Sequence, residues 1–202
     1  MMKLFYSPTS PFARKVRIVA HEFGLQDQIE FMKVDPLSDD DELINANPLS
    51  QIPTLVIDDG VSLFDSSVIA NYLDELAVKN GRESLFQPRA INYYDVQRMH
   101  ALASGIMENS VALTMERRRP VEQQSQMWKL RWEESILRSI SFIAKSDERF
   151  EQLHIGNLSF VIALEYIDFR QPQIDWRDDN EKLVSAIVEI QQRASFIETR
   201  FA

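Results

Sequence analysis

The chain of 202 residues contains no cysteine. Disulfide bonds, thiolate metal sites and a catalytic cysteine are therefore excluded. Histidine is nearly as scarce, with only His21, His100 and His154, which are far apart in the sequence. Because metal sites in proteins usually need several such ligands at short spacing, we expect no metal centre.

Long apolar runs and a basic charge are also missing. No apolar run approaches the roughly 20 residues that cross a bilayer, and the short N-terminal one leads into a proline-containing turn, unlike a secretory signal. The formal net charge of −9 is opposite in sign to what nucleic-acid binding requires. We therefore expect a cytosolic globular protein that binds neither membranes nor nucleic acid.

Glycine is scarce, with five residues, so most of the chain should be helical. The first 77 residues are different, because short apolar strands alternate with helices there. The hairpin signal Asp58-Asp59-Gly60 joins the last two strands in antiparallel fashion. The expected strands are 4–6, 29–34, 54–57 and 61–64, and the expected helices are 11–24, a short one from 39, and 68–76. This order, β-α-β-α-β-β-α, predicts a small mixed sheet covered by helices.

Residues 78–89 contain glycine and proline and are expected to form a linker. The chain after them, residues 90–202, has the patterns of helices only. We expect these helices at 90–119, 121–145, 158–169 and 178–196, the third of which is apolar on almost every face.

The stretch SPTSPFARKVRI, which follows the first strand, carries the clearest local signal. Ser10-Pro11 is a strong helix start, because serine is a preferred N-cap and proline fits the first helical position. The Ser10 hydroxyl would thus lie among unpaired amides at the positive end of a helix dipole, which suits an anion. A plain capping role for Ser10 is the alternative.

Four motifs in the right order together resemble the cytosolic glutathione transferase superfamily, and bacterial serine-type members in particular. The motifs are SPTSPFARKVRI, NPLSQIPTLVIDDG, LFDSSVIANYLDE and IGNLSFVIALEYIDFRQPQIDWR. The resemblance implies an α/β plus all-α fold. Its N-terminal thioredoxin-like β-α-β-α-β-β-α domain would be residues 1–77, and its C-terminal helical-bundle domain residues 90–202.

The resemblance also implies how glutathione would be held. Ser10 would face the glutathione sulfur, and Ile52, before a cis Pro53, would pair with the cysteinyl backbone. Asp65 and Ser66, at a second helix start, would hold the γ-glutamyl amine and carboxylate. The full implied set is Ser10, Phe12, Lys33, Val34, Gln51, Ile52, Pro53, Asp65 and Ser66. Thr9 first, and then Ser7, are alternative partners for the sulfur.

The pocket for a second substrate in relatives is built from the first loop and the long helix. This implies contacts from Tyr6, Pro8, Phe12, Met107, Val111 and Met115, although a methionine stripe at helical spacing is also typical of a core. Nearby, Arg117, Arg118 and Arg119 form a basic cluster in an acidic protein. The cluster either complements the helix dipole or attracts an anionic substrate.

Two positions depart from the family pattern. Ser50 stands where glycine is usual, so a positive φ there would be strained. His154 and Asn157 replace the usual Ser/Thr and Asp of the capping box in the third helix of the second half. From this replacement we expect a helix start weaker by about 1 kcal/mol.

The function that the resemblance implies is activation of the glutathione thiol for conjugation to an electrophilic, partly apolar substrate, or for peroxide reduction. Glutathione would be a co-substrate, no metal is implied, and relatives are two-fold dimers. A non-catalytic transferase-like protein with a binding or regulatory role is one alternative, and a carrier of apolar ligands is another.

Overall fold

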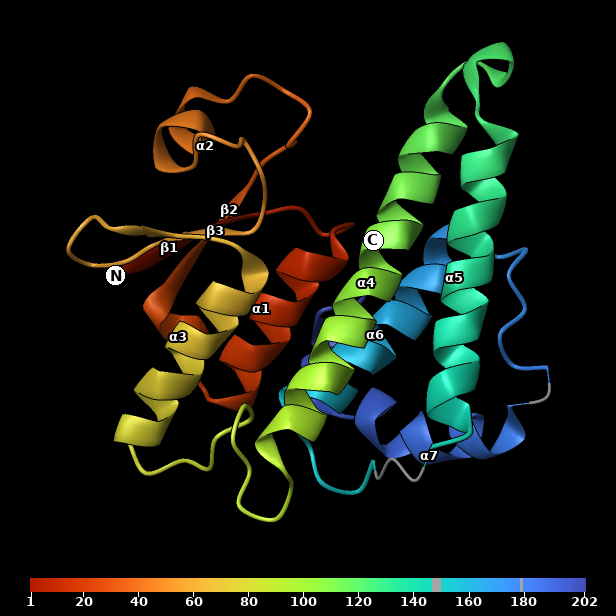
Figure 1. Cartoon of the computed structure of the whole chain (residues 1–202). Helices are drawn as coiled ribbons and strands as arrows, with labels where there is room; N and C mark the ends of the chain where they lie inside the picture. Colours follow the sequence, from red (N-terminus) through yellow and green to blue (C-terminus); the bar gives the residue numbers. More distant parts are fainter. Residues whose placement is uncertain (147–149, 179) are drawn as a thin grey trace. The chain divides into compact units, whose positions relative to one another are not determined.

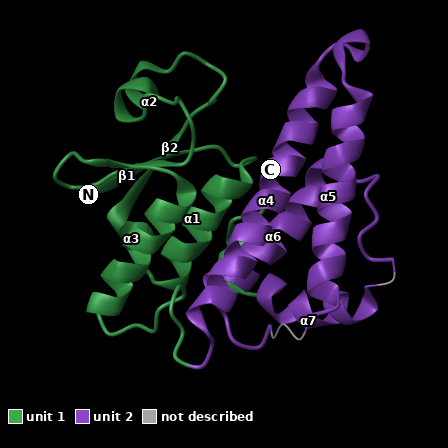
Figure 2. Ribbon diagram, viewed as in Figure 1, with its two compact units in different colours: residues 1–89, 193–202 green, residues 90–192 purple. Residues whose placement is uncertain are grey.

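A computed structural model describes the whole chain except residues 147–149 and 179 (Figure 1). The chain divides into two compact units, which are residues 1–89 with 193–202, and residues 90–192 (Figure 2). The division differs from the expected one, because residues 78–89 and the last ten residues belong with the first unit. None of the helices in the described ranges is long and apolar enough to cross a membrane.

Unit 1 has the expected β-α-β-α-β-β-α order and adds a helix from the C-terminus. Its elements are β1 (Met2–Tyr6), α1 (Pro11–Glu22), a 3-10 turn (Gln26–Gln28), β2 (Ile29–Lys33), α2 (Asp41–Ala46), β3 (Thr54–Val56), β4 (Ser62–Leu63), α3 (Ser66–Lys79) and α8 (Ala194–Glu198). The short helix is capped by Asp40, whose carboxylate accepts from the Leu43 amide, so it begins at 41 rather than 39.

The strands of unit 1 form a mixed sheet in the order β2-β1-β3-β4. β1 runs parallel to β2 and antiparallel to β3, and β3 and β4 form the expected hairpin. α1 and α3 lie side by side on one face of the sheet and α2 lies on the other (Figure 1). Fully buried residues such as Leu4, Val16, Leu55 and Leu73 make the core between sheet and helices.

The last ten residues join unit 1 because they pack on α1. The buried Arg14 guanidinium donates to the carbonyl oxygen of Phe196 (3.2 Å) and lies 4.4 Å from the ring of Phe201. At the other end of α1 the Glu22 carboxylate accepts from Arg193 (2.7 Å) and from the Ser195 hydroxyl. These contacts join residues far apart in sequence, so the helical periodicity of residues 178–196 could not indicate them.

Unit 2 is helical, as predicted. Its elements are α4 (Tyr93–Arg118), a 3-10 turn (Val121–Gln123), α5 (Gln126–Ala144), α6 (Ile155–Arg170) and α7 (Glu181–Gln191). α5 begins later than the expected residue 121, because the Ser125 hydroxyl caps it by accepting from the Trp128 amide. The final expected helix, 178–196, includes residue 179, which lies outside the described residues, and its described part is divided between α7 and α8.

The start of α6 carries a capping box made by His154 and Asn157. His154 Nδ1 accepts from the Gly156 amide (3.2 Å) and the Asn157 amide (3.3 Å), and Asn157 Oδ1 accepts from the His154 amide (2.9 Å). The box is therefore complete, because an unprotonated imidazole nitrogen accepts hydrogen bonds as a serine or threonine oxygen does. The expected loss of about 1 kcal/mol at this helix start stays a prediction.

Candidate functional site

Four connections of unit 1 meet at one end of its sheet. In the register of the parallel pair, Tyr6 at the end of β1 lies opposite Lys33 at the end of β2. β3 is antiparallel and starts at this same end, with Thr54 opposite Phe5, and β4 finishes there with Leu63. The segments 7–10, 34, 51–53 and 64–66 therefore leave the sheet together, and they contain most of the implied glutathione contacts.

Ser10 is the N-cap of α1, as the sequence predicts. Its hydroxyl oxygen accepts from the Ala13 amide (3.2 Å), and Pro11 occupies the first helical position. Within the described residues the Ser10 hydroxyl hydrogen has no acceptor. The capping role therefore leaves Ser10 able to donate one hydrogen bond to a ligand at the positive end of the α1 dipole.

The neighbouring hydroxyl groups are engaged with each other. Ser7 Oγ and Thr9 Oγ1 lie 3.1 Å apart, and the Thr9 amide donates to Ser7 Oγ (3.4 Å). A ligand that recruited Thr9 or Ser7 would compete with this pair, which favours Ser10 over both.

The loop before β3 carries the Ile52–Pro53 peptide bond, which is cis. Buried Asn47 fixes this loop: its Nδ2 donates to the Gln51 carbonyl oxygen (3.1 Å) and to Thr54 Oγ1 (3.0 Å), and its Oδ1 accepts from Leu49 (3.0 Å). The Ile52 amide and carbonyl have no partner in the described parts of the chain. They are thus available to an extended peptide backbone. The role of Asn47 was missed, although it opens the NPLSQIPTL motif.

The start of α3 presents a second set of donors and acceptors. Asp65 is the N-cap, and its Oδ1 accepts from the amides of Ser67 (2.9 Å) and Val68 (3.4 Å). Ser66 occupies the first helical position, where the amide has no helical partner. The remaining Asp65 oxygen can accept from an ammonium group, while the Ser66 amide and hydroxyl can donate to a carboxylate.

Lys15 is a residue near this helix start that the sequence analysis did not single out. Its side chain is fully buried, and its Nζ lies 3.5 Å from Ser67 Oγ. A positive charge therefore lies beside the amides of the α3 N-terminus, a combination that favours an anion. The sequence did not distinguish Lys15, because Arg14 and Arg17 lie beside it in the same helix.

The remaining implied contacts are less closely held. Lys33 and Gln51 are exposed, Phe12 and Val34 are half-buried, and Pro53 is buried. The Val34 amide donates to the Tyr6 carbonyl oxygen (3.0 Å), so its side chain position is fixed by the end of β1.

The residues implied for a second substrate fall in both units. In unit 1, Tyr6, Pro8 and Phe12 are half-buried, and Tyr6 packs edge-on against Phe31 at 5.8 Å. In unit 2, Met107 is fully buried, Val111 is half-buried and Met115 is 40% exposed. Met107 thus belongs to the core of unit 2, whereas Met115 is open to contact. The described residues hold no group of three or more His, Cys, Asp or Glu side chains placed to bind a metal ion.

Comparisons with known proteins add relatives over the whole chain. A family model described as glutathione S-transferase, N-terminal domain, matches residues 9–76. The GST-like protein YibF of Escherichia coli (strain K12) is 31% identical over 202 residues, which cover 98% of both chains. A stringent starvation protein A homolog of Coxiella burnetii is 39% identical over only 75 residues, 37% of this chain and 34% of its own.

Solved structures of glutathione transferase family members are also similar to this chain over its full length. A glutathione transferase family member from Pseudomonas fluorescens Pf-5, with bound glutathione, is 33% identical with a TM-score of 0.93 and full coverage of both chains. A second structure of a glutathione transferase family member from the same organism holds S-(propanoic acid)-glutathione and has a TM-score of 0.89.

Proposed function

Because this chain belongs to the glutathione S-transferase family, we propose that it binds glutathione at the end of the unit 1 sheet and activates the thiol for conjugation. The observation that carries the proposal is the meeting of Ser10, the Ile52 backbone and the Asp65-Ser66 helix start at one end of the sheet. A tripeptide with a central thiol needs these three kinds of contact.

Ser10 is the proposed catalytic residue. A free thiol has a pKa of about 8.5, so glutathione in water is mostly protonated at neutral pH. The Ser10 O–H donates to the sulfur and the α1 dipole adds positive potential, and both favour the thiolate. The thiolate attacks the electrophilic carbon, a sulfur–carbon bond forms, and the leaving group departs with its electron pair while the thiol proton passes to solvent.

The peptide itself is held by the other groups. Asp65 accepts from the γ-glutamyl ammonium, Ser66 donates to the γ-glutamyl carboxylate, and the Ile52 amide and carbonyl pair with the cysteinyl backbone. Lys33, Val34 and Gln51 are proposed to line the other end of the peptide. The remaining proposed contacts are Phe12 and Pro53.

The second substrate is proposed to be a small, partly apolar electrophile. The residues of unit 1 proposed to contact it are Tyr6, Pro8 and Phe12, all of which are half-buried. The thioether ligand in the Pseudomonas fluorescens relative supports chemistry at the glutathione sulfur. Glutathione-dependent peroxide reduction would use the same thiolate. We also propose a cytosolic location and a homodimer, as in relatives of this family.

A binding or regulatory role without catalysis is the second candidate. It is favoured by the match of 75 residues to stringent starvation protein A homologs, although that match covers 37% of the chain. Such a role does not need a donor to the glutathione sulfur, so turnover separates the two candidates.

The test is calorimetric titration with glutathione together with conjugation and peroxidase assays on wild type and Ser10→Ala. We expect glutathione binding by both proteins and turnover that falls at least about tenfold in the variant, the size of one charge-assisted hydrogen bond. An absence of glutathione binding would reject the proposal, and binding without turnover on any electrophile or peroxide would favour the second candidate.

A further inference from the structure

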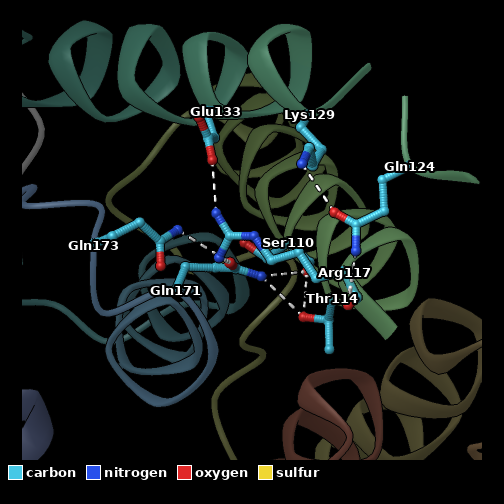
Figure 3. Close-up of polar contacts among 8 residues, drawn as sticks. All are labelled: Ser110, Thr114, Arg117, Gln124, Lys129, Glu133, Gln171 and Gln173. Atoms are coloured by element: carbon cyan, nitrogen blue, oxygen red, sulfur yellow. Dashed lines mark hydrogen bonds and ion pairs between the residues drawn. The ribbon is translucent and has the colours of Figure 1, made fainter. Parts of the chain in front are cut away.

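Two arginines at the end of α4 in unit 2 are paired with carboxylates. Figure 3 shows Arg117 between Glu133, to which it donates (2.7 Å), and Gln171, to which it also donates. Arg119 pairs with Glu116 at 3.1 Å. The two glutamates balance the charges of these arginines, so neither arginine requires an anion from outside the chain.

Arg17, in α1 of unit 1, has no such partner. Its guanidinium lies 5.1 Å from the centre of the Tyr6 ring, and it makes no hydrogen bond or ion pair with the described residues. Arg17 is half-buried, but none of its nitrogen atoms is fully enclosed, so an acceptor can reach them from solvent. Burial lowers the pKa of Arg17 because it disfavours the charged form. An anion beside this guanidinium would therefore be favoured.

Tyr6 adds a second unpaired donor at the same place. It is the last residue of β1, and its hydroxyl has no hydrogen-bond partner among the residues that the structure describes. The hydroxyl is not enclosed either. A phenol hydroxyl can donate to an anion, as a guanidinium does. Arg17 and Tyr6 together thus present several donors to one ligand.

Aromatic surface and a further positive charge border these donors. The ring of Phe31, on the edge strand β2, packs edge-on against Tyr6 at 5.8 Å and is 36% exposed. Lys33 lies opposite Tyr6 in the strand register and two residues after Phe31, so it shares their face of the sheet. Lys33 is exposed and has no carboxylate partner in the described chain. The position therefore favours a ligand that carries both an aromatic ring and a negative charge.

The same donors lie near the proposed position of the glutathione sulfur. Tyr6 and Ser10 belong to the end of the sheet where glutathione is proposed to bind. Arg17 follows Ser10 by seven residues, which is nearly two helical turns and about 10 Å along the axis of α1. Both residues thus lie on one side of the helix, and a long helical side chain leans toward the N-terminus. One aromatic ring is therefore long enough to connect an anion at Arg17 with the sulfur.

We propose that Arg17 and Tyr6 bind the carboxylate of an aromatic second substrate and so direct its electrophilic carbon to the glutathione sulfur beside Ser10. The inference rests on the proposed function and names the substrate class. A carboxylate suits the forked guanidinium, which can donate two parallel hydrogen bonds to it, and an aromatic ring suits the neighbouring Phe31. All the groups that hold the ligand belong to unit 1.

A titration without glutathione tests the anion site by itself. The probe is para-methylbenzoate, and para-methylbenzyl alcohol is its neutral counterpart. The proteins are wild type, Arg17→Met, Tyr6→Phe and the control Arg82→Met, which removes a unit 1 arginine that donates to the Glu22 carbonyl oxygen. We expect benzoate to bind wild type and control equally, about tenfold more weakly to Arg17→Met, and several-fold more weakly to Tyr6→Phe.

Three results would contradict the proposal. Equal benzoate binding by wild type, Arg17→Met and Tyr6→Phe, or no binding by wild type at millimolar benzoate, would overturn the site. Binding of the alcohol as tight as that of benzoate would overturn the role of the negative charge. Displacement of benzoate by inorganic phosphate as effective as by benzoate itself would overturn the carboxylate assignment.

A kinetic experiment links the site to catalysis through a matched pair of electrophiles, para-(chloromethyl)benzoate and its methyl ester. In both, the glutathione sulfur forms a bond to the benzylic carbon, chloride leaves with its electron pair, and the thiol proton passes to solvent. We expect kcat/KM to favour the acid in wild type and Arg82→Met, and this preference to fall about tenfold in Arg17→Met. A merely structural role of Arg17 would lower kcat/KM equally for acid and ester, which would contradict the proposal.

The two experiments also separate this proposal from the proposed function. If the protein binds no glutathione or turns over no electrophile, the proposed function fails, while the benzoate titration still decides the anion site. Equal kcat/KM for the acid and the ester in wild type would contradict the substrate class and leave the proposed function intact.

Discussion

The ammonium group of Lys15 lies 3.5 Å from the hydroxyl oxygen of Ser67, and the Lys15 side chain is fully buried. Lys15 belongs to α1, which Ser10 caps, and Ser67 belongs to the first turn of α3 beside Ser66. The pair joins the two helix starts that the proposed site uses. It also places a positive charge where the γ-glutamyl carboxylate is proposed to bind.

Lys15→Met should weaken glutathione binding, because it removes this charge while keeping an unbranched apolar chain in the same space. We expect the dissociation constant to rise about tenfold, or ~1.4 kcal/mol. Calorimetric titration measures the dissociation constant. The control is Lys3→Met, which also removes a lysine from unit 1, but one whose Nζ lies 3.8 Å from the exposed carboxylate of Glu42. An unchanged dissociation constant in a folded Lys15→Met protein would show that Lys15 only fills space.

The element order of unit 1 could be predicted because each strand and helix carries its own periodicity and turn residues. The caps Ser10 and Asp65 and the Asp-Gly hairpin turn bond only to residues next to them in the chain. The sequence is therefore sufficient to predict them. Lys15 and Asn47 could not be assigned in this way. Their partners lie on other elements, and only the folded chain shows that Lys15 reaches Ser67 and that Asn47 holds the loop before β3.

Gly156→Ala should destabilise the protein, because an added Cβ would lie 2.7 Å from Met99 Cβ and 2.8 Å from the Val96 carbonyl oxygen. Neither backbone nor a Cβ atom can move easily, so we expect a loss of about 3 kcal/mol and a melting temperature lower by ~6–12 °C.

The matched control is Gly105→Ala, in the interior of α4, where an added Cβ meets nothing within 4 Å. Alanine is the better helix former, so a gain of about 0.5–1 kcal/mol is expected. A thermal scan showing the two alanine variants equally stable would refute the close α4–α6 contact.

Ser50 has a φ of 50°, as its place in the motif before Pro53 suggested, and is the sole non-glycine residue with positive φ in the described chain. Ser50→Gly should relieve the left-handed conformation, whereas Ser50→Val should worsen it. We expect the free energies of unfolding of the two variants to differ by about 1–2 kcal/mol in favour of glycine. Denaturant titration measures these free energies. Equal free energies of unfolding for Ser50→Val and Ser50→Gly would contradict the expectation.

Acid should loosen the attachment of the C-terminal segment to α1. Burial disfavours the Glu22 carboxylate, but hydrogen bonds from Arg193 and Ser195 outweigh it, so the pKa of Glu22 lies below its usual range. A carboxyl whose pKa is lower when folded stabilises the fold above its unfolded pKa of about 4.3, and this contribution disappears as pH falls through the lower folded value.

The corresponding measurement compares melting temperatures of wild type and Glu22→Gln across the acid range. Near neutral pH wild type should be more stable by roughly 1 kcal/mol, since Arg193 is partly exposed and solvent screens the pair. The difference should shrink toward pH 3. A constant difference at every pH would mean that Glu22 contributes by packing alone.

The limits of sequence reasoning are clearest in the arginine cluster. Arg117, Arg118 and Arg119 are equivalent in the sequence, and only the structure distinguishes the two that are paired with glutamates from Arg118. The helical pattern likewise hid the return of residues 193–202 to unit 1, because an amphipathic helix does not specify which surface it covers. At His154 the sequence could not show whether the capping box forms, because capping preferences describe common residues, whereas the geometry needs only an acceptor nitrogen or oxygen.

The central claim is that Ser10 stabilises the thiolate of bound glutathione, and titration of that thiol by its ultraviolet thiolate absorbance tests it directly. The measurement is made on wild type, Ser10→Ala, Ser10→Thr and the cap control Ser125→Ala, each saturated with glutathione. Wild type, Ser10→Thr and Ser125→Ala should show a thiol pKa at least about one unit below 8.5, and Ser10→Ala should show a pKa near 8.5. A lowered thiol pKa that persists unchanged in Ser10→Ala would contradict the account.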